Sequence, residues 1–384
     1  MHPPPGRVRL GFYAPRSRTG IGQYQRMQQK ESQVVKHIDV RGSHFEIGEA
    51  HGRQAAAEIA TSLATYRQMF EEMAGLDWDA ARYEAERFKA AIEQVCPELL
   101  EEMAGIARGA DIDPLDVLVL NARSEIALTH AGGPVQPDGC SALFKRDPES
   151  GAQWLAQNWD WKPAQSEALI HMTIRAPDKP AIRMVTEAGI IGKIGFNEHG
   201  VGVCLNALRT SICKPRLPVH VMLRRVLESG GVEHALDMID EVGVASPAHF
   251  LIADAEGHAA GVEVSPMGDS AMAPRKGQLC HTNHLIARHL PPGLEDFPRE
   301  DSFVRLERLR ELVASAPPSF DTLRTHLSDE ENAPDAINRR DNPALEPRDR
   351  METLFTIVMN LSERRAELSF GKPADHPEVI TLTL

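Results

Sequence analysis

Apolar residues recur at three- and four-residue spacings along the first third of the chain, from about Phe45 to Leu128. This period is typical of amphipathic helices, so the segment is predicted to be mostly helical, with clear stretches at 97–107 and 114–128. Capping residues, proline and glycine predict the boundaries of these helices. Starts are expected at Ser43 (three residues before Glu46), Asp77, Pro97 and Asp113, and ends at Gly75 and Gly109.

From Cys140 onward the apolar period changes to two. Ile170, Met172 and Ile174 alternate with polar residues, which is typical of strands with one buried face. Turn residues at Asn197–Gly200 predict an antiparallel hairpin. Helices followed by runs of strands indicate an α+β fold rather than alternating βαβ units. Further strands are expected at 201–206, 249–254, 258–264, 353–361, 365–370 and 378–383, helices at 218–229, 232–241, 300–314 and 319–327, and a long loop at 332–350.

Composition places the chain among globular proteins. Of 384 residues, 42% are apolar and 25% charged, so a sizeable core can form and whole-chain disorder is excluded. The net charge of -13 opposes attraction to phosphate backbones, so no nucleic-acid partner is expected. No apolar run approaches the roughly 18 residues that a membrane span needs. We therefore expect a soluble protein without a membrane partner.

Residues 1–34 differ from the rest of the chain. They hold six basic residues and one acidic residue, so they carry +5 while the remainder carries -18. The segment lacks the apolar core of a secretory signal, and although an arginine-rich targeting peptide fits its charge, Pro3–Pro5 and scattered glycines favour a flexible extension or a translation start at Met27. The expected organisation is a tail at 1–34 and a single domain at 35–384.

Cysteine and histidine spacings give little support for disulfides or metals. The five cysteines are odd in number, widely spaced and without a CxxC pair, so reduced thiols in the cytoplasm are expected. His281, His284 and His289 have the spacing of a zinc ligand set, but no HExxH motif and no nearby acidic ligand accompany them. There is also no GxGxxG, P-loop or GxSxG motif. No metal and no organic cofactor are therefore expected.

Four short segments carry candidate chemistry. Asp138–Cys140 lies where the helical pattern stops and the first strand starts, which would leave the cysteine accessible to chemistry. Its ordinary interpretation is a small apolar residue opening a strand, and a reactive thiol would need partners. The others are Gln157–Trp161 at a strand end, Asn206 at the end of an apolar strand, and His281–His284 with several hydrogen-bonding side chains.

These segments, in this order and approximate spacing, resemble the acyl-coenzyme A:6-aminopenicillanic acid acyltransferase family, the penicillin acyltransferases of the N-terminal nucleophile (Ntn) hydrolases. The resemblance also includes Thr186–Asn197, and it extends from Phe45–Gly48 to Gly371–Pro373. It therefore runs from about residue 36 to the C-terminus. It implies a four-layer αββα sandwich of antiparallel sheets with helices on the outer faces.

The resemblance also implies a self-processing enzyme. The precursor would cut itself between Gly139 and Cys140, which divides the domain into an α-chain segment (35–139) and a β-chain segment (140–384) that remain partners. Cys140 would then be both nucleophile and N-terminus, and its α-amine, with a pKa of about 7.7–8.0, could take the proton of a thiol with a pKa of about 8.5.

Other site residues follow from the same resemblance. Asp160 matches the aspartate that orients the acyl acceptor, and Asn283 matches the asparagine that donates to the oxyanion. Arg350 matches an arginine that binds substrate. In our interpretation it binds a carboxylate of the substrate. Asn206 is a second oxyanion or positioning candidate. Ser302 and Arg305 are expected to serve packing or ion pairing.

Departures from the family pattern concern the substrate. Trp161 and Lys162 follow Asp160, where the penicillin enzymes have two phenylalanines that line the acyl pocket. Asp349 and Leu128 replace a serine and a tyrosine. We therefore expect Trp161 at the substrate and a different acyl group or amine. Hydrolysis of a small amide is as well supported as transfer from coenzyme A, whose thioester would be a substrate rather than a cofactor.

Two alternatives and one open property remain. Bile-salt hydrolases share the nucleophile but begin at the cysteine after a very short propeptide, and the long helical region before Cys140 argues against them. An unprocessed, inactive relative could instead bind an acylated small molecule. A homo-oligomer is compatible with the sequence.

Overall fold

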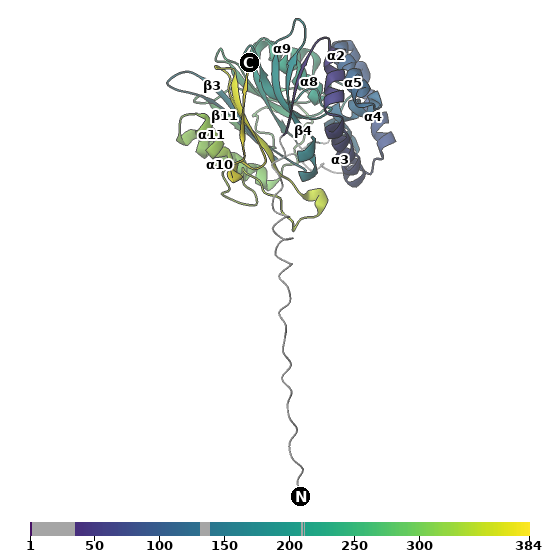
Figure 1. Ribbon diagram of the computed structural model, residues 1–384. Helices are drawn as coiled ribbons and strands as arrows, with labels where there is room; N and C mark the ends of the chain where they lie inside the picture. The colour runs from purple at the N-terminus through teal and green to yellow at the C-terminus, as the bar shows by residue number, and fades with distance from the viewer. Residues whose placement is uncertain (2–34, 131–138, 209, 211) are drawn as a thin grey trace. The chain divides into compact units, whose positions relative to one another are not determined.

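Two β-sheets pack face to face at the centre of the structure, a computed structural model that describes Met1 and residues 35–130, 139–208, 210 and 212–384 (Figure 1). The larger sheet has the order β1-β4-β5-β6-β7-β8-β9-β10, and the smaller has the order β11-β2-β3-β12-β13-β14. Contacts of β2 and β3 with β7 and β8 join the two sheets. The strands of the larger sheet are β1 (Lys36–Arg41), β4 (Leu169–Arg175), β5 (Ile182–Glu187), β6 (Ile194–Asn197), β7 (Gly202–Ala207), β8 (Ala248–Ala253), β9 (Ala259–Val264) and β10 (Ser270–Met272). Those of the smaller sheet are β2 (Gly139–Arg146), β3 (Gln153–Trp161), β11 (Gln278–His281), β12 (Glu352–Asn360), β13 (Arg365–Phe370) and β14 (Val379–Thr383).

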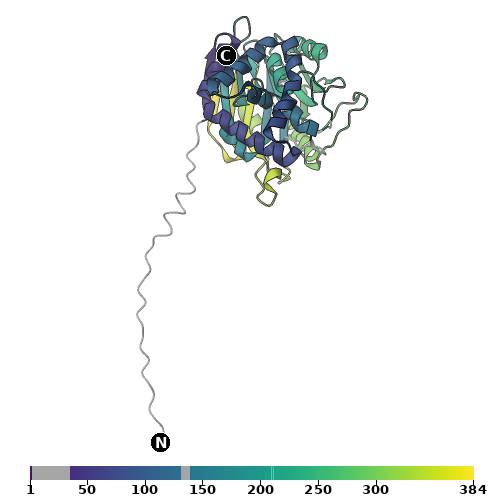
Figure 2. The ribbon, with the colours of Figure 1, turned by 90° about the vertical axis from the view of Figure 1, so that its right-hand side faces the viewer.

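Helices cover the outer face of each sheet, as Figures 1 and 2 show. The larger sheet contacts α2 (His44–Gln54), α3 (Ala56–Ala74), α8 (Val219–Leu227) and α9 (Val232–Val242). The smaller sheet contacts α10 (Glu300–Ser315) and α11 (Phe320–Leu327). The predicted α+β fold with a four-layer αββα order is confirmed. The remaining helices are α4 (Trp78–Val95), α5 (Pro97–Ala110), α6 (Pro114–Asn121) and α7 (Arg123–His130), with 3₁₀ turns at Pro163–Ala168, Pro347–Asp349 and Pro373–Asp375.

The predicted helix starts are confirmed by their capping geometry. Ser43 and Glu46 form a complete capping box at the start of α2. The Asp77 carboxylate accepts from the backbone of Ala80 at 2.8 Å, and the Asp113 carboxylate accepts from Leu115 at 2.8 Å. These bonds satisfy backbone N–H groups that have no partner inside the helix.

Two predictions within the helical region are wrong. The pattern at 114–128 spans two helices, because Ala122 (φ -112°, ψ 18°) interrupts it between α6 and α7. Gly109 does not end α5, which continues to Ala110 and is capped by Asp111 in the left-handed region. A methyl group at Gly109 would lie 2.2 Å from the Glu49 carbonyl oxygen of α2. The glycine therefore permits a close helix crossing rather than a chain reversal.

The predicted strands are present, and the structure adds four that the pattern did not indicate: β1, β5, β10 and β11. β1 runs parallel to β4. The larger sheet was expected to be antiparallel throughout, and this pair departs from that expectation. Predictions for residues 1–34 and for Asp138 lie outside the described residues. No helix in the described part of the chain is both long and apolar enough to cross a membrane.

One end of the smaller sheet gathers the candidate segments. Gly139 pairs with Asp160 and Cys140 with Trp159 across β2 and β3, and Thr353 of β12 also pairs with Asp160. Val35–Leu384 forms one compact unit, and the two long connections that precede α10 and β12 return to this end of the sheet.

Candidate active site

The Gly139–Cys140 bond lies at the first position of β2. Paired residues of an antiparallel sheet project from the same face, so Cys140 shares the face of Trp159, toward the larger sheet. Gly139 shares the opposite face with Asp160. Cys140 is completely buried, so the expectation of an accessible cysteine is wrong for the uncut chain.

Asn283 holds the backbone of Cys140. Its side-chain oxygen accepts from the Cys140 amide N–H at 2.8 Å and from Arg305 Nη2 at 3.0 Å. Two donors at one oxygen fix the orientation of this amide. Its nitrogen donates to the Ala207 carbonyl oxygen at 3.1 Å, and the Ser302 hydroxyl accepts from the Asn283 backbone at 2.8 Å. The asparagine thus links Cys140 to the end of β7.

Arg305, on α10, is more closely involved than the sequence indicated. It does pair with Asp301, whose carboxylate lies 3.0 Å from Nη2, but its Nη1 also donates to the Cys140 carbonyl oxygen at 2.7 Å and to the Ser141 hydroxyl at 3.2 Å. The side chain is completely buried apart from 1% of its surface. One planar guanidinium therefore fixes both the backbone of Cys140 and the side chain of Asn283.

Asp160 faces the glycine of the candidate bond. Its Oδ1 accepts from the Thr353 hydroxyl at 2.7 Å, and its Oδ2 lies 3.4 Å from Arg339 Nε. A methyl group on Gly139 would stand 2.9 Å from this Oδ2. Burial raises the pKa of Asp160 to about 6, although Arg339 and Arg305 favour the charged form. Oδ2 accepts no hydrogen bond from any described residue.

Arg339 completes this cluster, and the sequence pattern did not identify it. Its Nη2 donates to Asp301 at 2.5 Å, and its backbone exchanges hydrogen bonds with Thr353. Burial opposes the ionisation of Asp301, but Arg305, Arg339 and Arg299 together lower its pKa well below the usual range. The sequence offered one indirect signal, the consecutive Arg339 and Arg340 in a stretch predicted to be a loop. An arginine that is buried needs an acidic partner.

The structure does not bring Arg350 into this cluster. Its guanidinium donates to the carbonyl oxygens of Leu345 at 3.0 Å and Pro343 at 2.8 Å. It lines a separate cavity of about 250 Å³ with Lys162, Thr65 and Met69. Lys162 donates to the Arg348 and Arg350 carbonyl oxygens, so it anchors the segment that carries Arg350.

Asn206 and His281 belong to one buried group of hydrogen-bonded side chains. The Asn206 side-chain oxygen accepts from His249 Nδ1 at 2.9 Å, and its nitrogen donates to the His281 carbonyl oxygen at 3.4 Å. His249 and His281 stack with centroids 3.5 Å apart, and His281 Nε2 meets Glu263 at 3.0 Å. Asn206 is therefore satisfied within the protein, in a position to support Asn283.

The three histidines considered as metal ligands go to separate places. His281 pairs with Glu263, an acidic neighbour that the local sequence did not reveal, and His284 contacts the Ser302 hydroxyl at 2.7 Å. His289 borders a different cavity. Among the described residues, no three His, Cys, Asp or Glu side chains gather as metal ligands.

Aromatic and charged groups occupy the inner side of the site. Trp161 stacks on Trp159 with centroids 5.9 Å apart, and Lys193 lies 3.1 Å from the centroid of the Trp159 ring. Lys193 also bonds Glu187, whose carboxylate meets Arg123 at 3.2 Å. Burial opposes the charge of Glu187, but Arg123 and Lys193 lower its pKa to about 2. On this side Cys140 therefore lies next to the indole rings of Trp159 and Trp161, and Trp159 contacts the buried ion cluster of Lys193 and Glu187.

Comparisons with known proteins match most of the chain that forms this fold. The profile of the acyl-coenzyme A:6-aminopenicillanic acid acyl-transferase family matches residues 146–375. The 40 kDa form of acyl-coenzyme A:6-aminopenicillanic-acid-acyltransferase from Emericella nidulans is 34% identical over 355 residues, covering 90% of this chain and 96% of that protein. The profile begins six residues after Cys140, whereas the alignment with the relative spans most of both chains.

The solved structures that match this chain share little sequence with it. Penicillin V acylase from Agrobacterium tumefaciens has a TM-score of 0.42 and 14% identity, covering 64% of this chain and 86% of its own. A variant of the conjugated bile acid hydrolase from Clostridium perfringens has a TM-score of 0.43 and 12% identity, covering 64% of this chain and 92% of its own.

Proposed function

Because this chain belongs to the acyl-coenzyme A:6-aminopenicillanic acid acyltransferase family, we propose that it is a self-cleaving cysteine Ntn enzyme that transfers or hydrolyses the acyl group of a small amide or thioester. The observation that carries the proposal is the setting of the Gly139–Cys140 bond. Asn283 holds the nitrogen of this bond at 2.8 Å, and Asp160 faces its glycine.

Self-cleavage would begin with attack of the Cys140 sulfur on the Gly139 carbonyl carbon. The S–C bond forms, the C–N bond breaks, and the thiol proton passes to the departing nitrogen, which becomes the α-amine of Cys140. Water then hydrolyses the thioester, leaving a carboxylate on Gly139 and restoring the thiol. Glycine suits this position because a methyl group would meet Asp160 and Arg339 at 2.9 and 3.1 Å. The products are the segments 35–139, with any tail, and 140–384.

Turnover would use the new amine as the base. It takes the thiol proton, the thiolate attacks the substrate carbonyl, and the leaving amine or thiol departs with that proton. Water or an amine then releases the acyl group and restores the thiol. Asn283 would keep the α-amine in place through Oδ1, while its Nδ2 would leave the Ala207 carbonyl to donate to the oxyanion, a contribution of about 3–4 kcal/mol in related sites.

The other predicted residues have supporting roles in this proposal. Asp160 would orient the acyl acceptor, and Asn206 would support Asn283. Trp161 would border the acyl group on the inner face. Arg350, at the mouth of the 250 Å³ cavity, would bind a substrate carboxylate there, at the position where Lys162 replaces an expected aromatic residue.

Acylation of Cys140 is the direct test of this function. The wild-type protein is incubated with a short acyl-coenzyme A or with penicillin V, and 6-aminopenicillanic acid serves as one acceptor among several amines. We expect an acyl adduct on the 140–384 segment and release of product. Cys140→Ala should give neither, and the matched control Cys213→Ser should give both.

The alternative is an uncut protein that binds an acylated molecule without reacting. The same experiment separates the two. Tight, saturable binding of the acyl compound to an intact chain, with no adduct and no product, would support the binding protein and overturn the enzyme.

A further inference from the structure

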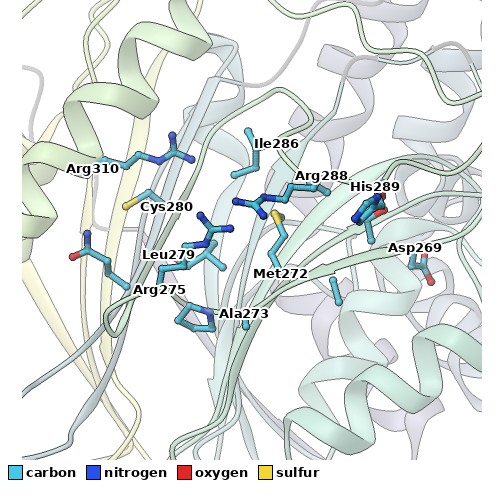
Figure 3. Close-up of a pocket in the computed structure, with 15 residues that line it drawn as sticks. Asp269, Met272, Ala273, Arg275, Leu279, Cys280, Ile286, Arg288, His289 and Arg310 are labelled. Carbon is cyan, nitrogen blue, oxygen red and sulfur yellow. The ribbon is translucent and has the colours of Figure 1, made fainter.

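A large hollow opens where the edge strands of the two sheets meet. β10 ends the larger sheet and β11 ends the smaller one, and between them lies a cavity of about 880 Å³. Met272, Leu279 and Ile286 give it an apolar lining (Figure 3). This volume lies within the range of small-molecule sites, about 300–1,000 Å³.

Three arginines from separate elements converge on this hollow. Arg275 follows β10, Arg288 lies in the segment after Asn283, and Arg310 comes from α10. Figure 3 shows the three guanidinium groups pointing toward the same space. Of the described residues that line the hollow with them, Asp269 alone is acidic. All three side chains are exposed. Water and salt therefore screen their charges, but a phosphate in the hollow would still be attracted by all three.

Asp269 does not pair with any of the three arginines. Asp269 lines the far end of the hollow, and burial raises its pKa to about 6. The protein as a whole carries a net charge of -13. A concentration of three cations on such a protein is therefore a local feature of this cavity.

The walls of the hollow are fixed by internal hydrogen bonds. The Glu263 carboxylate accepts from the backbone of Ile286 at 2.6 Å and of Ala287 at 3.3 Å, directly before Arg288. The Ser270 hydroxyl donates to the His289 carbonyl oxygen at 2.6 Å. The segment that carries Arg288 is thus positioned before any ligand arrives, which lowers the entropy cost of binding.

We propose that this hollow binds an organic phosphate of nucleotide size. Guanidinium groups match phosphate oxygens in pairs and remain charged at every physiological pH. The apolar lining from Met272, Leu279 and Ile286 would receive the organic part. The site contains none of Cys140, Asp160 and Asn283, and it does not depend on the proposed acyl chemistry.

Calorimetric titration of the full chain tests the proposal, with ATP, coenzyme A, inorganic pyrophosphate and citrate as probes. We expect the two nucleotides to bind, more tightly than pyrophosphate and citrate and more weakly at high salt. If coenzyme A binds more tightly than ATP, the phosphate group that the hollow recognises belongs to a thioester donor. If the two bind equally, it belongs to a free nucleotide. Repeating the titrations with Cys140→Ala makes the result independent of self-cleavage.

Charge-removing variants assign the binding to this hollow. Arg275→Gln, Arg288→Gln and Arg310→Gln should each weaken nucleotide binding about tenfold, as expected for loss of a charged hydrogen bond. The triple variant should abolish it, and Arg108→Gln, an exposed arginine on α5, should change nothing. Nucleotide binding that survives the triple substitution, citrate that binds as tightly, or no binding of either nucleotide would overturn the proposal.

Discussion

Asp160 is the residue whose charge the site controls most directly. It is completely buried, and burial raises its pKa to about 6 despite two nearby arginines. The carboxyl group next to Gly139 is therefore close to half-protonated in mildly acidic solution. A group in this state could both accept and return a proton in the proposed cleavage of the adjacent bond.

The raised pKa of Asp160 predicts a pH-dependent difference in stability. The pKa of Asp160 is raised on folding from 3.8 to about 6. Its contribution to the stability of the fold is therefore fully present below pH 3.8 and is lost as the pH rises through 6. The free energy of unfolding of the Cys140→Ala protein should therefore fall by roughly 2 kcal/mol relative to Cys140→Ala/Asp160→Asn between pH 4 and pH 7. Urea unfolding across this range measures it, and a constant difference would refute the assignment.

Arg305 should matter for cleavage because it contacts two groups at once. Arg305→Lys keeps the charge but cannot reach both the Cys140 carbonyl and Asn283 with a planar fork. We expect self-cleavage to slow at least tenfold, by roughly 1.4 kcal/mol of barrier. The control is Arg308→Lys, three residues along the same helix, whose guanidinium meets Asp329 at 2.7 Å. The time course of chain cleavage on denaturing gels provides the measurement, and equal rates for both variants would contradict this role.

The sequence predicted only part of the candidate site at this scale. Cys140, Asp160 and Asn283 came from the resemblance, and the structure brings them together. Arg305 and Arg339 were not predicted as contacts of Cys140 or Gly139, since each reaches the site through a buried ion cluster around Asp301 that joins distant segments. Local spacing contains no record of such long-range pairs. Arg350 lies apart for the opposite reason, because its guanidinium donates to carbonyl oxygens of its own loop.

At the scale of elements, the packing of α2 on α5 depends on glycines. A methyl group at Gly48 would lie 1.9 Å from the Glu102 carbonyl oxygen, and one at Gly105 would lie 2.2 Å from that of Phe45. The backbones touch along this crossing. Sequence reasoning cannot distinguish a glycine that ends a helix from one that admits a neighbour, which is why Gly109 was misassigned.

Gly48→Ala should therefore destabilise the protein strongly. The added methyl group must push the two helices apart, and such overpacking costs about 1–3 kcal/mol or more. Gly230→Ala is the control, because its nearest neighbour would be 3.9 Å away. Chemical unfolding of both variants in the Cys140→Ala background compares them. Similar losses of stability would show that the crossing is not as close as described.

The predicted elements were those with long, regular patterns. Alternation and capping signals identified most strands and most helices, although they missed β5 (Ile182–Glu187) inside the larger sheet. The short strands β10 (Ser270–Met272) and β11 (Gln278–His281) escaped because three or four residues contain too little periodicity. β1 (Lys36–Arg41) was missed because its partner β4 is more than a hundred residues away.

At the scale of the whole molecule, the candidate cut would divide the chain without dividing the fold. Residues before Gly139 supply β1 and helices α2–α7. All the remaining strands, β2 to β14, come from Gly139 and the residues after it. β1 pairs with β4 along six residues, and α3 packs on β5. The two segments share one hydrophobic core.

The two segments should therefore stay together after cleavage. Native mass spectrometry or size exclusion of the cut protein should give a mass equal to the sum of both segments, and separation should require denaturant. Segments that part under native conditions would show that the shared core contributes little to their association. Uncut Cys140→Ala provides the reference for the associated form.

The central claim is that Cys140 cuts the bond before it, and intact-mass measurement of freshly purified protein under denaturing conditions tests this most directly. For the wild type we predict two species whose masses divide the sequence between Gly139 and Cys140, and for Cys140→Ala one species of full length. A wild-type chain that stays whole, with a thiol at Cys140 that resists alkylation, would contradict the account and leave a binding protein on this fold.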